Sequence, residues 1–340
     1  MLYNLHLLRV IAALGVVYFH ITSEAGFGLD WDVGSRGVDV FFVISGFIIA
    51  YIATSKPDQF LVRRVIRVVP FYWAATVFVF AIVAVVPHLF RTTQADFTHL
   101  IFSLFFIPRE APDGGMWPTL VLGWSLNYEM FFYVLFALSL RISQQHSPLI
   151  CCGWIIAFFI MLNTFAGGSP TMSFYGRPIV LEFCYGVGVF YLFTWLDGHK
   201  ATLARYAAGK WLLVLVLVGN LVAINVLEQH YRDEISRAVI AGIPSFFIVL
   251  SALLLERIYG VATKNKTIYL LGEASYIVYL VHPYIIYTVI RLAIKDSDSL
   301  PAPVLALLII GLVALSSVIA VAIHVWFEKP VMKYLRDKLA

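Results

Sequence analysis

Residues 4–21 read NLHLLRVIAALGVVYFHI, an apolar run that holds Arg9 in its first half and His20 near its end. A helix of about 20 residues crosses the ~30 Å hydrocarbon core of a bilayer, so this run can span a membrane. Similar runs recur along the chain, whose 340 residues are 61% hydrophobic and 13% charged. Soluble domains have about 25% charged residues, which excludes a soluble enzyme, a disordered protein and a nucleic-acid binder.

Ten runs are long enough to cross a membrane, and we expect an all-α, polytopic helical bundle. The predicted spans are 4–21, 38–54, 68–87, 119–140, 149–166, 177–196, 211–228, 237–256, 268–292 and 303–326. A further apolar stretch, Phe97–Ile107, has only 11 residues and is expected to be re-entrant or interfacial. The polar intervals are shorter than the ~50 residues of a soluble domain, so we expect a single transmembrane domain over 1–340 and no soluble domain.

The distribution of basic residues predicts the orientation. With a cytoplasmic N-terminus, the inner segments hold 15 Lys and Arg residues, and the outer segments with their helix ends hold 8. Basic residues concentrate on the cytoplasmic side, so we expect both termini there. The three cysteines have no paired spacing and no metal-binding motif is present, so we expect neither a disulfide framework nor a metal.

The first span carries two ionisable side chains on one face. Arg9 and His20 are eleven residues apart, which places them within about 20° of each other and ~16 Å apart along a helix. A charge in mid-bilayer costs ~2.5–3.5 kcal/mol and therefore marks a candidate functional site. The alternative is that Arg9 extends to the inner headgroups and that His20 ends the helix in water.

The second and third spans add further candidates. Asp39 lies at the depth of His20, where a carboxylate can orient an imidazole, and Ser45 lies deeper. Arg64 and Arg67 share a helical face, and such pairs bind phosphates through forked hydrogen bonds. In the alternative interpretation, Asp39 lies in the membrane interface and Ser45 only packs against a neighbouring helix. The two arginines would then only mark the cytoplasmic boundary of the membrane.

Two later spans repeat the pattern. Ser125, Tyr128 and Glu129 share a helical face, with Trp124 beside them, and an unpaired Glu129 within a span is hard to explain as structure alone. In the ninth span, Ser275, Tyr279 and His282 share a face, and Pro283 is expected to kink the helix and free a carbonyl.

Taken in chain order, these segments resemble the acyltransferase 3 family of integral-membrane acyltransferases. The resemblance covers nearly the whole chain and rests on Leu8-Arg9 with His20, Gly37 to Phe47, Arg64 and Arg67 before Pro70-Phe-Tyr72, Trp124-Ser-Leu with Glu129, Leu271-Gly272 with Ser275-Tyr276 and His282, and Phe327-Glu-Lys-Pro330. Bacterial members without an appended soluble domain acetylate exopolysaccharide or O-antigen sugars, which implies an enzyme of the bacterial inner membrane.

The resemblance implies transfer of an acetyl group from cytoplasmic acetyl-CoA to a sugar hydroxyl of a polysaccharide or lipid-linked saccharide at the outer face. The other partners expected are membrane lipids, with no nucleic acid and no metal. The expected roles are catalysis by His20, with Asp39 and Glu129; coenzyme A binding by Arg9, Arg64, Arg67, Ser45 and Tyr72; and substrate binding by Trp124, Ser125, Tyr128, Tyr279 and His282.

Two mechanisms and two alternative functions stay open. His20 either deprotonates the sugar hydroxyl as a general base, which we favour, or carries the acyl group as an acyl-imidazole. The acyl group can instead be succinyl, and the acceptor can be peptidoglycan, a lipid or a small molecule. A protein of another class, a transporter or flippase for a lipid-linked saccharide, would also have buried charges and about ten helices.

Overall fold

The computed structural model describes residues 2–24, 34–53, 58–87, 93–165, 167–293 and 301–340. These residues form helices and connecting turns, and no strand occurs among them. Arg91 and Lys295, two of the basic residues assigned to outer segments, lie outside the described residues.

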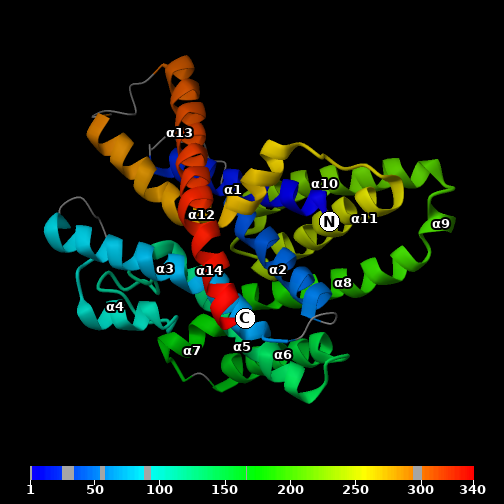
Figure 1. The fold of residues 1–340 in the computed structure, drawn as a ribbon, viewed down its shortest axis with the longest axis horizontal. Helices are drawn as coiled ribbons and strands as arrows, with labels where there is room; N and C mark the ends of the chain where they lie inside the picture. The colour runs from blue at the N-terminus through cyan, green and yellow to red at the C-terminus, as the bar shows by residue number, and fades with distance from the viewer. Residues whose placement is uncertain (1, 25–33, 54–57, 88–92, 166, 294–300) are drawn as a thin grey trace. The chain divides into compact units, whose positions relative to one another are not determined.

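The chain is a polytopic helical membrane protein, as the sequence predicts. In the described residues each predicted span coincides with a helix (Figure 1). They are α1 (Tyr3–Glu24), α2 (Gly37–Ala53), α3 (Phe60–Val85), η2 (Val121–Gly123) with α5 (Trp124–Ile142), α6 (Ser147–Phe165), η3 (Pro178–Leu181) with α8 (Glu182–Gly198), α10 (Ala207–Tyr231), η4 (Ala238–Gly242) with α11 (Ile243–Tyr259), α12 (Lys266–Ala293) and α13 (Ala302–Ile323).

Eight of these helical segments are long and apolar enough to cross a membrane. The other two are α2, an apolar helix of 17 residues, and α12, whose 28 residues include Glu273, His282 and several tyrosines. Helix α10 shows why a bilayer is needed, because only 11% of its 18-residue apolar stretch is buried inside the protein and Leu215 is 68% exposed. Contiguous apolar surface of this extent is not tolerated in water.

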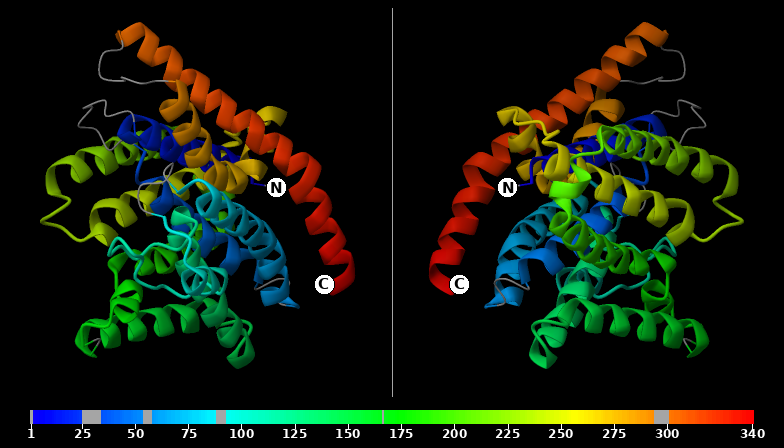
Figure 2. Two further views of the ribbon diagram at one scale, coloured as in Figure 1. Left: turned by 90° about the vertical axis from the view of Figure 1, so that its left-hand side faces the viewer. Right: turned by 90° about the vertical axis from the view of Figure 1, so that its right-hand side faces the viewer.

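Three short helices and the C-terminal helix complete the chain: α4 (Phe97–Leu104), α7 (Pro170–Tyr175), α9 (Lys200–Leu203) and α14 (Lys329–Leu339). Helix α4 has eight residues, too few to cross a bilayer, as expected for the segment Phe97–Ile107. Helical conformation continues from α13 through the π-helical turn η5 (His324–Glu328) into α14 (Figure 2).

The chain divides into two compact units. The first unit comprises Met1–Ile48 and Tyr185–Phe327. In it α1 packs along α12, where a Cβ on Gly272 would lie only 2.7 Å from the Cβ of His6, so glycine permits the close approach. The carboxylate of Glu256 accepts hydrogen bonds from the N–H groups of Tyr3 (2.9 Å) and Asn4 (2.7 Å), which satisfies donors at the start of α1 that have no partner within the helix.

The second unit comprises Ile49–Cys184 and Glu328–Ala340. Two bonds attach α4 to α3: the hydroxyl of Tyr72 donates to the carbonyl of Ser103 (3.0 Å), and the indole of Trp73 donates to that of Leu104 (2.7 Å). Stacked aromatic rings fill the core of this unit, for example Tyr128 on Phe174 with ring centroids 4.3 Å apart.

Candidate active site

Two histidines from distant parts of the chain meet in the first unit. His20 lies in the last turns of α1, and His282 lies in α12, where it is completely buried. Their ring centroids are 5.0 Å apart, and Nε2 of His282 is 3.4 Å from Nδ1 of His20. Because α1 and α12 pack side by side, the fold brings together two residues that are 262 positions apart.

The hydrogen bonds of the pair determine where each ring carries its proton. Nδ1 of His20 is 2.9 Å from the carbonyl oxygen of Val16, and Nδ1 of His282 is 2.9 Å from that of Val278. A carbonyl oxygen only accepts, so both Nδ1 atoms are donors, and in neutral rings both Nε2 atoms carry lone pairs. The lone pair of His282 faces the Nδ1–H of His20, so this one hydrogen is shared between the carbonyl of Val16 (2.9 Å) and, as the longer branch, Nε2 of His282 (3.4 Å). Nε2 of His20 has no hydrogen-bond partner among the described residues and can act as a base.

The other two residues of the predicted α12 face, Tyr279 and Ser275, have different contacts. The ring of Tyr279 lies with its centroid 6.2 Å from that of His282, and Ser275 donates to the carbonyl of Gly272 at 2.9 Å. Pro283 lies within the helix and has no N–H group, so the usual helical donor to the carbonyl of Tyr279 is missing. The His282 side chain instead hydrogen-bonds to the backbone of Tyr279.

Asp39 forms an ion pair that the sequence does not predict. The side chain of Asp39 is completely buried and accepts two parallel hydrogen bonds from the guanidinium of Arg237, both 2.8 Å long. Arg36 and Glu228 form a second ion pair in the same unit. Arg237 directly precedes the π-helical turn η4, and such turns are frequent at functional sites. In the sequence it was only one of the outer basic residues, since nothing local relates it to Asp39.

In the second unit, Glu129 and Arg64 occupy neighbouring positions. Glu129 accepts a hydrogen bond from the hydroxyl of Tyr133, one turn later in α5. Arg64 interacts electrostatically with both of these side chains and with Arg67, and its guanidinium lies over the ring of Phe60 at 5.6 Å. The Nε atom of Arg64 is buried and has no hydrogen-bond partner among the described residues. The fold therefore groups a predicted catalytic carboxylate with both predicted phosphate-binding arginines.

The predicted substrate face of α5 is mostly buried. Tyr128 is inaccessible and its hydroxyl donates to the carbonyl of Phe174, whereas Ser125 donates to the carbonyl of Leu122 at 3.2 Å. The ring of Trp124, which is half-buried, meets that of Tyr128 edge-on at 6.1 Å.

The other predicted coenzyme A residues differ in accessibility. Arg9, Ser45 and Arg67 are half-buried, whereas Tyr72 is completely buried. The candidate residues thus fall into two sets. The first unit holds Arg9, His20, Asp39, Ser45, Tyr279 and His282, and the second holds Arg64, Arg67, Tyr72, Trp124, Ser125, Tyr128 and Glu129. Among the described residues, no group of three His, Cys, Asp or Glu side chains is placed to hold a metal ion.

Comparison with known proteins gives consistent similarities. The family model described as an acyltransferase domain matches residues 2–322. The exopolysaccharide production protein ExoZ of Rhizobium meliloti (strain 1021) is 33% identical over 323 residues, which cover 93% of this chain and 94% of that protein. The acyltransferase MdmB of Streptomyces mycarofaciens is 24% identical, over 96% of this chain and 91% of its own. The putative acetyltransferase ORF330 of Acidianus two-tailed virus is 25% identical, over 81% of this chain and 80% of that protein. No solved structure matches the chain significantly.

Proposed function

Because the chain belongs to the acyltransferase family whose model it matches, and is therefore a membrane acyltransferase, we propose that it is an O-acetyltransferase. It moves an acetyl group from cytoplasmic acetyl-CoA to a sugar hydroxyl of a surface or exported polysaccharide. The polysaccharide acceptor is supported by the name of ExoZ, an exopolysaccharide production protein. The apolar helices support a membrane location, which we propose is the bacterial inner membrane. The excess of basic residues in the segments predicted to be inner supports a cytoplasmic position of both termini.

The observation that carries the proposal is the Nε2 atom of His20, which has no hydrogen-bond partner in the part of the chain that the structure describes. In the proposed reaction this atom takes the proton of the sugar hydroxyl, and the oxygen attacks the thioester carbonyl. The carbon–sulfur bond then breaks, the thiolate of coenzyme A leaves, and it receives the proton from His20. The products are an acetyl ester and coenzyme A. His282 is a positioning residue, because its lone pair faces the N–H on the opposite side of the His20 ring.

Coenzyme A is the proposed ligand of the arginines in α3. The Nε atom of Arg64, which has no partner among the described residues, is the kind of donor that a phosphate oxygen satisfies, and Arg67 adds a second positive charge. We assign Arg9 and Ser45 to the path of the pantetheine arm, the buried Tyr72 to support of that path, and Asp39 and Glu129 to charge support of the reaction. Trp124, which is half-buried, is assigned to contact with the acceptor, and the buried side chains of Ser125, Tyr128, Tyr279 and His282 are assigned to positioning behind that contact.

The test is the exchange His20→Ala. Acetylation of the polysaccharide should disappear while the folded protein persists in the membrane. His230→Ala is the matched control, because His230 makes the same bond to the carbonyl four residues earlier (Nδ1 to Val226, 3.0 Å) on an exposed surface. Retained activity in His20→Ala would refute the assignment of the base.

The mechanism is tested separately. Direct transfer predicts that the protein, incubated with radiolabelled acetyl-CoA and no acceptor, carries no covalent label. A trapped acetyl-histidine at His20 would instead establish the two-step route.

A further inference from the structure

The C-terminal helix α14 packs on α3 within the second unit. Its packing face follows the spacing i, i+4, i+7: Glu328, directly before the helix, and Met332 are buried, and Leu335 is half-buried. In Figures 1 and 2 the C-terminal end of α14 lies beside the beginning of α3. Arg64 and Arg67 belong to the first turns of α3, so α14 ends near both predicted phosphate-binding arginines.

A stripe of basic side chains runs along α14 next to its packing face. Lys329, Lys333 and Arg336 are exposed, and each follows a member of the packing face by one residue. One residue corresponds to ~100° around a helix, so these three side chains form a row that flanks the contact with α3. We call this row, which extends over ~10 Å of helix, the basic stripe.

The contact between α3 and α14 carries excess positive charge. The first turns of α3 and the whole of α14 hold seven basic residues and one acidic residue, Asp337. Three further carboxylates are near them: Asp58 before α3, Glu129 beside Arg64, and Glu328 before α14. Like charges at neighbouring positions of a helix are destabilising, and here two basic helices pack together. This arrangement favours a multiply charged anion as ligand.

The two helices offer donors of the kind that bind phosphates. The Nε atom of Arg64 is buried and has no hydrogen-bond partner among the described residues, and a buried donor in a folded protein normally has an acceptor. On α14, Nε of Arg336 donates to the carbonyl of Met332 at 3.2 Å, which leaves the two terminal nitrogens of the guanidinium for another acceptor. Phosphate oxygens accept such forked hydrogen bonds from arginine and attract lysine as a point charge.

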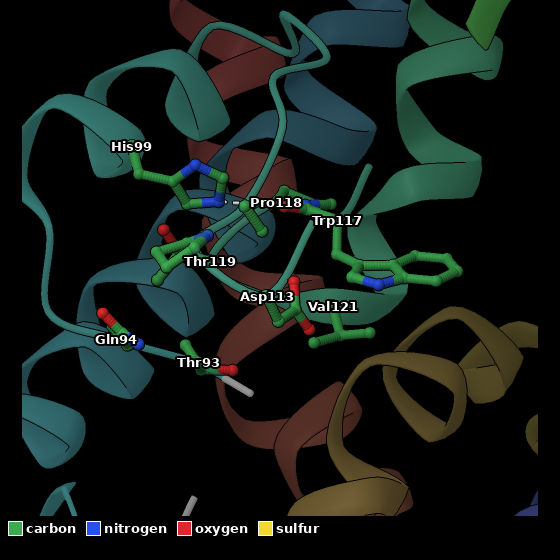
Figure 3. Close-up of a pocket in the computed structure, with 10 residues that line it drawn as sticks. Thr93, Gln94, His99, Asp113, Trp117, Pro118, Thr119 and Val121 are labelled. Atoms are coloured by element: carbon green, nitrogen blue, oxygen red, sulfur yellow. Dashed lines mark hydrogen bonds between the residues drawn. The ribbon is translucent and has the colours of Figure 1, made fainter. Parts of the chain in front are cut away.

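A notch between α4 and the segment that leads into α5 is a poor alternative site for an anion (Figure 3). Nε2 of His99 donates to the carbonyl of Trp117 across it at 2.9 Å, and the space has room for about one water molecule. The carboxylate of Asp113 also lines the notch and would repel a phosphate. In the described part of this unit, the basic surface of α3 and α14 therefore suits an anion better.

Coenzyme A carries its phosphates at two distances from the thiol. The diphosphate is attached to the pantetheine arm, whereas the 3′-phosphate lies beyond it on the ribose and, as a phosphate monoester, carries about −1.5 to −2 charges near neutral pH. Arg64 is mostly buried, whereas the basic stripe is exposed. The diphosphate, which follows the arm into the protein, therefore matches Arg64 and Arg67, and the outer 3′-phosphate matches the basic stripe.

We propose that the basic stripe of α14 binds the 3′-phosphate of coenzyme A, next to a diphosphate held by Arg64 and Arg67. The identity of the ligand rests on the proposed function, in which acetyl-CoA is the donor. The stripe then gives the protein a preference for coenzyme A over the same molecule without its 3′-phosphate.

The experiment compares coenzyme A with dephospho-coenzyme A, which lacks only the 3′-phosphate. Each is titrated by calorimetry into the purified full-length protein in nanodiscs of phosphatidylcholine. Lys333→Gln should weaken coenzyme A binding about threefold, as expected for one exposed ion pair. Adding Arg336→Gln should bring the loss to about tenfold, or ~1.4 kcal/mol, while dephospho-coenzyme A binds both variants as it binds the unaltered protein. Lys338→Gln is the matched control, because Lys338 lies on the opposite side of α14, over the ring of Tyr334 at 4.8 Å; it should leave both affinities unchanged.

The outcomes separate the basic stripe from other roles. Unchanged coenzyme A binding in the double variant, or an equal loss for both ligands, would overturn the assignment of the 3′-phosphate. If the stripe binds anionic lipid headgroups instead, the double variant should lose affinity for phosphatidylglycerol vesicles and keep its affinity for coenzyme A, which also overturns the proposal. A preference for coenzyme A that depends on the stripe, without any acetyl transfer, would support the stripe and refute the proposed function. Absence of coenzyme A binding by the unaltered protein would refute both.

Discussion

Replacing His282 tests the central feature of the proposed site, because the two histidines are assigned unequal roles. In His282→Leu, the ring of His20 loses the lone pair that faces Nδ1 but keeps its bond to the carbonyl of Val16. The lost contact is 3.4 Å long, beyond the 2.7–3.2 Å typical of strong protein hydrogen bonds. We therefore assign it no more than the usual net value of ~0.5–1.5 kcal/mol.

That energy sets the expected rate. It corresponds to a decrease in kcat of about two- to thirteen-fold at 25 °C, whereas loss of a general base costs ~10²–10⁴-fold. His282→Leu should therefore be much more active than His20→Ala, and KM for acetyl-CoA should not change. His282→Gln should recover part of the loss, because its side-chain carbonyl can accept from the N–H of His20.

The assay is the initial rate of transfer from radiolabelled acetyl-CoA to deacetylated oligosaccharide by the purified protein. Because His282 is completely buried, the unfolding temperature of each variant is measured alongside, and His230→Leu is the matched surface control. Equal losses in folded His282→Leu and His20→Ala would refute the assignment of His20 as base and His282 as its support.

Other expected outcomes concern separate parts of the chain. Arg237→Ala removes the forked partner of the buried Asp39 carboxylate and should cost about 3 kcal/mol, the lower end of the range for a broken buried pair because Arg237 is 30% exposed. Thermal unfolding should show a smaller loss when Asp39→Asn is added. Coenzyme A at 100 times its Kd should raise the free energy of unfolding by ~2.7 kcal/mol. Arg64→Ala should abolish this stabilisation, whereas Arg63→Ala, at an exposed neighbouring residue, should preserve it. Burial lowers the pKa of His99 in α4, so the folded state favours the neutral imidazole over the charged one. The stability of α4, measured by hydrogen exchange, should therefore fall as the pH drops below ~6.5, the pKa of an unfolded histidine. His99→Gln should reduce this pH dependence.

Hydropathy predicted where the helices lie better than where they end. The third span was expected to begin at residue 68, but α3 begins at Phe60, and the tenth was expected to end at 326, whereas helix continues to Leu339. In both cases Lys and Arg residues interrupt the apolar run without interrupting the helix. Hydropathy reports contact with lipid, and charged residues at a membrane boundary are good helix formers.

The candidate site was predictable only as a set of residue types at suitable depths. Local spacing placed His282, Tyr279 and Ser275 on one face of a helix, and this prediction requires no knowledge of other helices. The pairing of His20 with His282 and of Asp39 with Arg237 depends on which helices pack together. A single sequence contains no signal for such contacts, because the same hydropathy pattern is compatible with many helix arrangements.

The cost of burying a charge identifies candidates for function but does not distinguish among them. On that criterion Arg9, Asp39, Arg64 and Glu129 are equivalent, since each would be expensive if unpaired. Hydrogen bonds separate some of them: Asp39 has a forked partner inside the fold, whereas Arg64 keeps a buried donor without a partner among the described residues. His20 likewise uses one nitrogen to fix its ring and leaves the other available. We therefore propose that a phosphate or a reacting hydroxyl binds at such available atoms of Arg64 and His20, rather than at buried charges in general.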